Sequence, residues 1–185
     1  MARSGASRRH VALLRGINVG GRNKLPMKTL VGIFEGLGCG DVTTWIQSGN
    51  VVFSAAPRHT GRLAARVSRG IAEAVGLDVP VVLRSADELA AIVENNPFVA
   101  DGADERGLHV MFLADRPAAA QIAALDAGRS PPDEFRVLGR EVYLSCPNGV
   151  ARTKLTNAYF DARLSTVSTS RNWRTVQKLL ELSRG

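Results

Sequence analysis

The stretch "HVALLRGINVGGRNKLP", residues 10–26, decides how the chain begins to fold. Residues 10–15 form an apolar run that ends at Arg15, which is typical of a strand buried on both faces. Pro26 is favoured at the start of a helix, and apolar residues recur behind it at helical spacing as far as Gly38, a residue suited to ending a helix. The loop between them holds three glycines and the cations Arg22 and Lys24 but no acid, and Arg15 precedes it directly. The stretch therefore predicts a strand, a basic glycine-rich loop and a helix.

The rest of the first half continues with strands and helices. Their predicted bounds are strands over 42–47 and 51–53, a helix over 63–75, a strand over 79–84 and a helix from Ser85 to Asn96. A tight turn at Gly49-Asn50 joins the two neighbouring strands, and Ser85 with Glu88 forms a capping box. The order strand-helix-strand-strand-helix-strand is that of the ferredoxin-like split βαβ pattern.

The second half begins again after a polar, acidic segment. Its predicted elements are a strand over 108–113, a helix over 117–126, a hairpin of strands 135–138 and 141–145 about Gly139-Arg140, and helices near 153–163 and 172–183. We therefore predict an α+β protein. Its parts are a disordered basic tail over 1–9, a ferredoxin-like βαββαβ subdomain over 10–98, a linker over 99–107 and a second small α+β subdomain, βαββαα, over 108–185. The two halves resemble each other in the order of their elements, without a residue-level repeat.

The composition is that of an ordinary globular chain of 185 residues, 45% of them hydrophobic. No apolar run approaches the roughly 20 residues of a membrane helix, and the basic N-terminus leads into a strand rather than the apolar core of a signal peptide. Cys39 and Cys146 lie far apart and lack the spacing of metal ligands. These features predict a cytoplasmic protein that has no disulfide framework, metal, cofactor or membrane segment.

The formal net charge of +7 is concentrated at the two ends of the chain. Residues 1–28 contain seven Lys and Arg residues and no acid, and residues 151–185 contain seven against Asp161 and Glu181. Cationic ends around an acidic middle favour a polarised surface and a phosphate-bearing or polyanionic partner. The alternative is an arginine-rich composition together with a basic tail that has no ligand.

The predicted topology brings the basic loop 16–25 and the hairpin turn 47–50 to the same edge of the first sheet. Glycines allow backbone N–H groups to converge on an anion, and the start of the following helix adds positive potential. Amide and hydroxyl side chains would orient the ligand. The candidate ligand-binding residues here are Arg15, Asn18, Arg22, Lys24, Gln47, Ser48 and Asn50. The alternative is that the glycines only permit a tight connection and the cations are solvated.

A second cationic locus is predicted in "CPNGVARTKLTN", residues 146–157. Pro147-Asn148-Gly149 is a turn signal, and Thr153 is suited to cap the helix that follows. Asn148, Arg152 and Lys154 are the candidate ligand-binding residues of this locus, together with Asn172, which also has the character of a helix cap. Whether this locus meets the first one is left open. The neighbouring Trp173 is either a core residue or a platform for stacking a base.

Four motifs in order resemble those of the bacterial domain-of-unknown-function family number 1697. They are VALLRGINVGG at 11–21, IQSGNVVF at 46–53, PNGVARTKLT at 147–156 and RNWRTV at 171–176. The resemblance runs from His10 to about Leu182. It implies two small α+β subdomains, the first of them ferredoxin-like, and it implies no established activity. Members of the family commonly have glycine and serine where this chain has Ala151 and Thr153, and asparagine where it has Arg174.

Three functions follow from these observations. The first, which we favour, is binding of a phosphate-bearing or other anionic ligand, either a nucleotide or a nucleic acid, although aromatic residues make up only 5% of the chain and offer few stacking platforms. The second is an enzyme acting on a phosphorylated or nucleotide-like substrate. Its catalytic residues are not apparent, because His10, His59 and His109 are scattered and no carboxylate pair lies near the motifs. The third is a non-catalytic interaction protein whose motifs are structural. The oligomeric state is left open.

Overall fold

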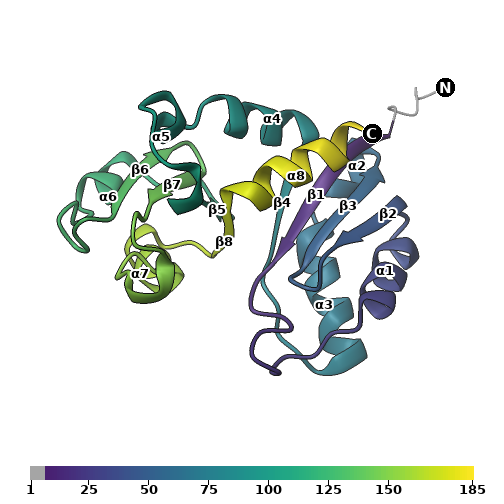
Figure 1. Cartoon of the computed structure of the whole chain (residues 1–185). Coiled ribbons are helices and arrows are strands. Elements are labelled where there is room, and N and C mark those ends of the chain that lie inside the picture. Colours follow the sequence, from purple (N-terminus) through teal and green to yellow (C-terminus); the bar gives the residue numbers. More distant parts are fainter. Residues whose placement is uncertain (1–6) are drawn as a thin grey trace. The chain divides into compact units, whose positions relative to one another are not determined.

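The computed structural model describes residues 7–185, so six residues of the predicted basic tail lie outside the described residues. The chain forms two compact units, one of Met1–Leu89 with Leu179–Gly185 and the other of Ala90–Lys178 (Figure 1). It passes between them within α4 (Ala86–Glu94) and within α8 (Trp173–Arg184). The predicted linker over 99–107 contains the end of α5 (Pro97–Ala100) and a 3-10 turn, η1 (Glu105–Gly107).

The first unit is built on a four-stranded antiparallel sheet in the order β2-β3-β1-β4. Its elements are β1 (Arg8–Leu14), α1 (Met27–Gly36), β2 (Gly40–Trp45), β3 (Asn50–Ala55), α2 (Pro57–Thr60), α3 (Leu63–Val75) and β4 (Val81–Ser85). This order is consistent with the predicted ferredoxin-like pattern. The first strand begins at Arg8, inside the stretch predicted to be a disordered tail, because Arg8 and Arg9 pair with Ala55 and Ser54 of β3.

The core of the first unit lies between one face of this sheet and the two longer helices. Alternate strand residues such as Leu14 and Phe53 pack with Leu30 and Phe34 of α1 and with Ile71 of α3, all of them fully buried or nearly so. The alternation follows from the two-residue period of a strand, and the helical residues share one face at spacings of three and four. The predicted helical periodicity of α1 and α3 is therefore the one that builds this core.

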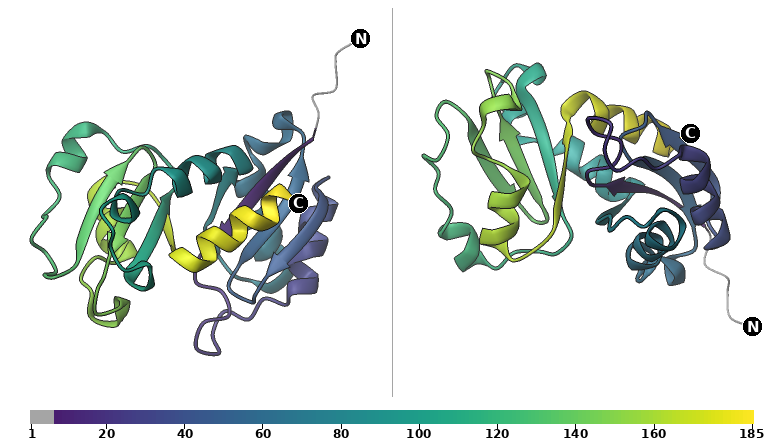
Figure 2. Two further views of the ribbon diagram at one scale, coloured as in Figure 1. Left: turned by 45° about the horizontal axis from the view of Figure 1, so that its top comes forward. Right: turned by 90° about the horizontal axis from the view of Figure 1, so that it is seen from below.

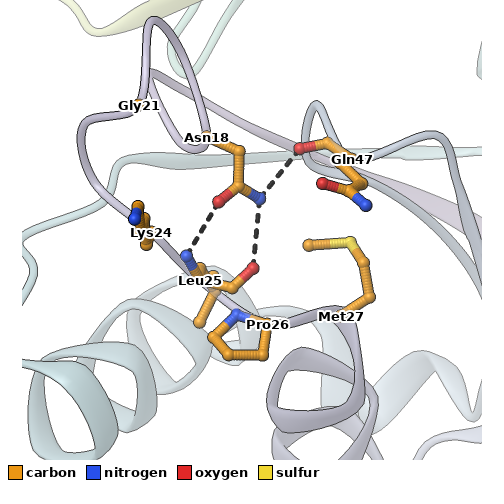
Figure 3. Close-up of a pocket in the computed structure, with 7 residues that line it drawn as sticks. All are labelled: Asn18, Gly21, Lys24, Leu25, Pro26, Met27 and Gln47. Carbon is orange, nitrogen blue, oxygen red and sulfur yellow. Dashed lines mark hydrogen bonds between the residues drawn. The ribbon is translucent and has the colours of Figure 1, made fainter.

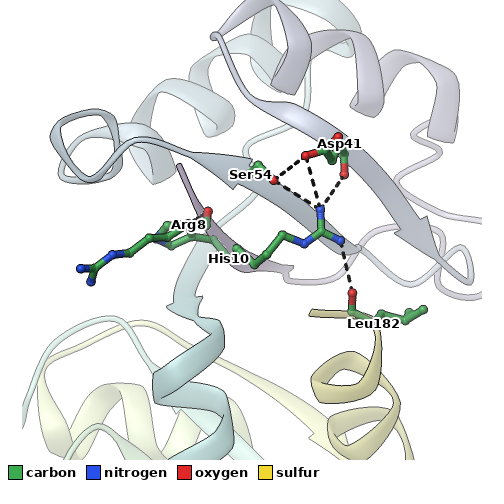
Figure 4. Close-up of polar contacts among 6 residues, drawn as sticks. Arg8, His10, Asp41, Ser54 and Leu182 are labelled. Atoms are coloured by element: carbon green, nitrogen blue, oxygen red, sulfur yellow. Dashed lines mark hydrogen bonds and ion pairs between the residues drawn. The ribbon is translucent and has the colours of Figure 1, made fainter. Parts of the chain in front are cut away.

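Arg9 fixes the last residues of the chain to the first sheet (Figure 4). Its guanidinium donates hydrogen bonds to the carbonyl of Leu182 at 3.2 Å, and to the carbonyl of Asp41 and the hydroxyl of Ser54 at 3.4 Å each. The Leu182 carbonyl is in the last turn of α8, where helical carbonyls lack intrahelical partners. A side chain near the start of the chain thus satisfies a backbone group near its end, in agreement with the assignment of Leu179–Gly185 to the first unit.

The second unit has the same strand order as the first, β6-β7-β5-β8, with all neighbours antiparallel (Figure 2). Its elements are β5 (Leu108–Leu113), α6 (Ala119–Ala123), β6 (Glu134–Leu138), β7 (Glu141–Ser145), η2 (Val150–Arg152), α7 (Asn157–Leu164) and β8 (Ser168–Asn172). The predicted order βαββαα was wrong in one respect, because β8 lies between the last two helices. Ser168 to Asn172 carry no apolar side chain, so periodicity did not reveal a strand that is held by pairing with β5.

The structure also bears on the role of Trp173 and on the expectation that the chain has no membrane segment. Trp173 is 2% exposed, so its indole lies in the interior and does not offer a stacking surface. Within residues 7–185, no helix combines the length and the apolar composition needed to cross a membrane.

Candidate functional site

The glycine-rich loop, the start of α1 and the β2–β3 turn surround a cavity of about 400 Å³ (Figure 3). The residues that line this first cavity are Asn18, Gly21, Lys24, Leu25, Pro26, Met27 and Gln47. All of them belong to the first unit. Loop and turn are joined directly, because the Asn18 amide donates a hydrogen bond to the Gln47 carbonyl at 2.9 Å.

Asn18 holds the loop in shape. Its side-chain nitrogen also donates to the Leu25 carbonyl at 3.0 Å, and its side-chain oxygen accepts from the Leu25 N–H at 2.9 Å. In Figure 3 the amide lies between Leu25 and Gln47, with both of its N–H groups engaged. Asn18 thus lines the cavity as predicted for a site residue, and its amide in addition positions the other residues of the lining.

Ser48 and Asn50 hold the neighbouring turn. Asn50 is fully buried, and its amide donates to the Ser48 hydroxyl at 2.9 Å and to the Trp45 carbonyl at 3.2 Å. Neither residue lines the first cavity. Gln47 is the member of the predicted turn set that does line it, and within the described chain its side-chain amide has no hydrogen-bond partner.

Among the predicted cations of the loop, Lys24 lines the first cavity in the described structure, whereas Arg15 and Arg22 do not. Lys24 is exposed, and its ammonium makes no ion pair or hydrogen bond within residues 7–185. Arg15 is half-buried next to β4, where its N–H donates to the Pro80 carbonyl at 3.0 Å. Arg22 is exposed on a tight bridge with Val19.

The start of α1 brings positive potential to the first cavity. Pro26 is the N-cap residue, and among the described residues no side chain caps the helix and no acid occupies its first turn. The helical hydrogen bonds begin with Leu30, which donates to the Pro26 carbonyl at 3.1 Å. The N–H groups of residues 27–29 therefore have no partner within the helix, and their partial charges add to the macrodipole. Pro26 and Met27 line the cavity, so this end of the helix lies at its wall.

The backbone around the first cavity adopts conformations that L-residues rarely take. Asn18, Asn23 and Ile46 have φ values of 53°, 50° and 49°. Asparagine tolerates this region, but a β-branched side chain such as that of Ile46 is strained there. Ile46 is also 54% exposed, so burial of its side chain does not compensate for the strain. Strained residues that persist in a fold are found preferentially at functional sites.

The second predicted locus lines a separate cavity of about 580 Å³ in the second unit. Its lining residues are Ser130, Pro131, Pro132, Asp133, Asn148, Gly149, Ala151, Arg152 and Thr153. Asn148 and Arg152 were predicted, whereas Ser130 and Asp133 were not. The signal that could have found Asp133 is the hairpin register. Because Glu134 pairs with Ser145, the preceding Asp133 lies across from Cys146, where the predicted locus begins.

Lys154 and Thr153 have structural roles in this locus. The Lys154 N–H donates to the Ser130 hydroxyl at 3.0 Å and its carbonyl accepts from Arg129 at 3.0 Å, and the residue does not line the cavity. The prediction that Thr153 caps the following helix was wrong. That helix, α7, is capped by Thr156. The Thr156 hydroxyl accepts a hydrogen bond at 3.2 Å from the Tyr159 N–H, which has no partner within the helix.

Asn172 does not lie at this cavity. Its side-chain oxygen accepts from the Thr175 N–H at 2.8 Å at the start of α8, so it acts as a helix cap, the other role that its sequence position suggested. The neighbouring Arg171 is half-buried, and desolvation of its guanidinium lowers its pKa to about 10. In the part of the chain that the structure describes, no group of three His, Cys, Asp or Glu side chains is arranged to hold a metal ion.

Comparisons with known proteins agree with the fold. Residues 8–143 match a family described as "Protein of unknown function (DUF1697)". Among solved structures, the chain is similar to the conserved bacterial protein SP0830 from Streptococcus pneumoniae, with 21% identity and a TM-score of 0.75 over 97% of this chain and 100% of that one. No sequence among curated proteins matches the chain. At this identity the structural likeness concerns the fold alone.

Proposed function

The chain belongs to the DUF1697 family, whose description assigns no function, and we propose that it binds a phosphate-bearing or otherwise anionic small molecule in the first cavity. One observation carries the proposal: an unpaired ammonium, that of Lys24, and the uncapped start of α1 lie at one cavity, and none of its seven described lining residues is acidic. Backbone N–H groups at a helix start and a nearby lysine are the donors that phosphate groups use in proteins.

The lining also indicates the shape of the ligand. Leu25, Pro26 and Met27 add an apolar wall, and Gln47 adds a free amide opposite Lys24's loop. A bare phosphate ion would not contact the apolar wall, whereas a phosphate ester with an organic part would contact both that wall and the polar groups of Lys24 and Gln47. The cavity of about 400 Å³ is within the range of small-molecule sites. A mononucleotide or a similar phosphate ester is the ligand class that this combination favours.

A second candidate is a nucleic acid, which the exposed cations next to Lys24 favour. Arg22 and Lys28 lie on either side of it in the chain, both exposed, and a polyphosphate backbone would contact several such cations at once. The two candidates differ in their dependence on salt. A polymer that displaces counterions from several phosphates loses affinity steeply as salt rises, whereas a mononucleotide loses little.

Thermal unfolding tests the proposal directly. We expect a nucleoside monophosphate or inorganic phosphate, with and without Mg²⁺, to raise the midpoint of the wild-type protein, since a ligand of the folded state stabilises it by about 2.7 kcal/mol at a concentration of 100 Kd. Lys24→Ala removes one charged hydrogen bond, which weakens binding roughly tenfold or more. At the same ligand concentration the stabilisation would then fall to about 1.4 kcal/mol. Oligonucleotides at two salt concentrations form the second arm.

Lys28→Ala is the matched control. It removes the same charge from the first turn of α1 but from a residue that does not line the cavity, so the stabilisation by a small ligand should be nearly unchanged. Equal losses in both variants, together with a steep dependence on salt, would favour the nucleic acid. If no ligand of the panel shifts the wild-type midpoint, the proposal is wrong and the loop is a structural connection.

A further inference from the structure

Asp133 is a buried carboxylate that the protein leaves half satisfied. Its side chain is 9% exposed, and one of its oxygens, Oδ2, accepts a hydrogen bond from the Ser130 hydroxyl at 2.9 Å. Within residues 7–185, the other oxygen, Oδ1, has no hydrogen-bond donor, and no cation lies within ion-pair distance of the carboxylate. The residue lines the cavity of about 580 Å³ in the second unit. A buried charge in this condition is costly unless something pairs with it.

The surroundings keep this carboxylate in place. The Ser130 hydroxyl, which donates to it, accepts from the Lys154 N–H at 3.0 Å and lies 3.5 Å from the Thr153 hydroxyl. The Asp133 N–H donates to the Ser130 carbonyl at 2.7 Å, so backbone and side chain are held by the same residue. These contacts fix Oδ2 and leave Oδ1 as the acceptor that a molecule in the cavity can reach.

The same cavity is lined by a cation that also lacks a protein partner. Arg152 is exposed, and in the described chain its guanidinium makes no ion pair or hydrogen bond. Asn148, exposed as well, adds a free amide to the same lining. A fixed negative group and a positive group thus border one cavity without neutralising each other by contact. A ligand with opposite charges at its two ends would pair with both.

We propose that this cavity binds a small zwitterion, whose primary ammonium donates to Oδ1 of Asp133 and whose carboxylate or phosphate accepts from Arg152 and Asn148. The inference goes beyond the anion site of the first cavity, because it involves other residues and requires a cationic group in the ligand. An ammonium fits better than a hydroxyl, since a neutral donor would leave the buried charge uncompensated. A metal ion fits less well, since among the described residues no group of three His, Cys, Asp or Glu side chains is arranged to hold one.

Amide NMR of the full chain tests this site. The probes are a set of free α-amino acids and O-phosphoethanolamine, which separate a carboxylate from a phosphate as the acidic end. The corresponding α-hydroxy acids, which lack the ammonium, and simple alkylamines, which lack the acid, are the negative probes. We expect saturable shifts of the amide signals of Ser130, Asp133 and residues 148–153 with at least one zwitterion. The affinity should be roughly ten- to a hundredfold lower for the negative probes, because each lacks one charged hydrogen bond.

Substitutions test whether Asp133 and Arg152 bind the zwitterion. Asp133→Asn should weaken binding by a similar factor, and Glu134→Gln, which removes the same charge from the exposed neighbouring residue, should not. Arg152→Ala changes an exposed side chain and should also weaken binding, whereas Arg163→Ala, at another exposed arginine of the second unit, is its control. The proposal is overturned if no zwitterion binds, if α-hydroxy acids bind as well as α-amino acids, or if binding survives Asp133→Asn or Arg152→Ala unchanged.

Discussion

Gly49 is the residue at which the structure makes the sharpest prediction about stability. It lies in the β2–β3 turn beside the first cavity, with φ at +78°, and its carbonyl accepts from the Leu14 N–H at 2.8 Å. A Cβ added there would be 2.7 Å from the Cβ of Leu14 and 3.2 Å from two carbons of Ile17. The Leu14 Cβ is attached directly to the backbone of the inner strand β1, so it cannot move away from a Cβ at position 49 without distorting the sheet.

The cost of Gly49→Ala has two parts. The left-handed backbone costs an L-residue about 1–2 kcal/mol, and forcing a methyl group into a packed interior costs about 1–3 kcal/mol. We therefore expect the free energy of unfolding to fall by about 2–5 kcal/mol. Gly21→Ala separates the two parts, because Gly21 has nearly the same φ, +75°, but no atom within 4 Å of an added Cβ. That control should lose only the backbone part, about 1–2 kcal/mol.

Urea unfolding, followed by circular dichroism, measures the difference. With a slope of about 2 kcal/mol per molar urea, a steric part of about 2 kcal/mol separates the midpoints of the two variants by roughly 1 M. The reasoning is refuted if Gly49→Ala unfolds at the same urea concentration as Gly21→Ala, since the contact with Leu14 would then cost nothing.

Three other predictions concern single side chains. In the same urea assay, Asn18→Ala should lower the free energy of unfolding by about 2–4 kcal/mol, because three hydrogen bonds of 2.9–3.0 Å are lost. Asn23→Ala loses one hydrogen bond of 2.8 Å and should lower it by about 1 kcal/mol. Burial lowers the pKa of His109 below 6.5, so the unfolded chain binds a proton at this residue more readily than the folded chain does. The free energy of unfolding should therefore be independent of the protonation of His109 above pH 6.5 and should decrease as the pH falls toward the folded pKa. In His109→Gln this decrease should be smaller. Burial raises the pKa of Cys146 to about 11 and also raises that of Cys39, so a thiol reagent at pH 8 should label both only after unfolding.

Each of these has a result that contradicts it. Equal losses for the two asparagine variants would mean that Asn18 does not hold the loop. An identical pH dependence of stability in wild type and His109→Gln would remove the histidine from the acid response. Rapid labelling of a thiol in the native protein would show that the cysteines are not enclosed as the structure has them.

Local sequence signals predicted most of the fold but only part of the site. The strand, loop and helix of residues 10–36 follow from apolar periodicity and from the preferences of proline and glycine, which act over a few residues. Strand β8 was missed because Ser168–Asn172 is polar, and its pairing with β5 depends on residues that are far away in the sequence. Asp133 was missed for the same reason, since only the hairpin register brings it to the second cavity.

The amide side chains show a second limit of sequence reasoning. Asn18, Asn50 and Asn172 were predicted to bind a ligand, and in the structure each makes a hydrogen bond with the protein's own backbone. A turn or helix end that needs a side-chain partner selects the same residue type as a ligand does, because both require a short side chain with a donor and an acceptor. Lys24 and Arg152 differ from them, since their charged groups have no partner within the described chain.

The contact between Arg9 and Leu182 can form only when synthesis of the chain is nearly complete. The second unit, Ala90–Lys178, is made between the two parts of the first, and at about 5–20 residues per second its translation takes roughly 4–18 s. During that interval the first sheet has left the ribosome without Leu179–Gly185, and Arg9 has no Leu182 carbonyl to contact. The first unit to be started is therefore the last to be finished.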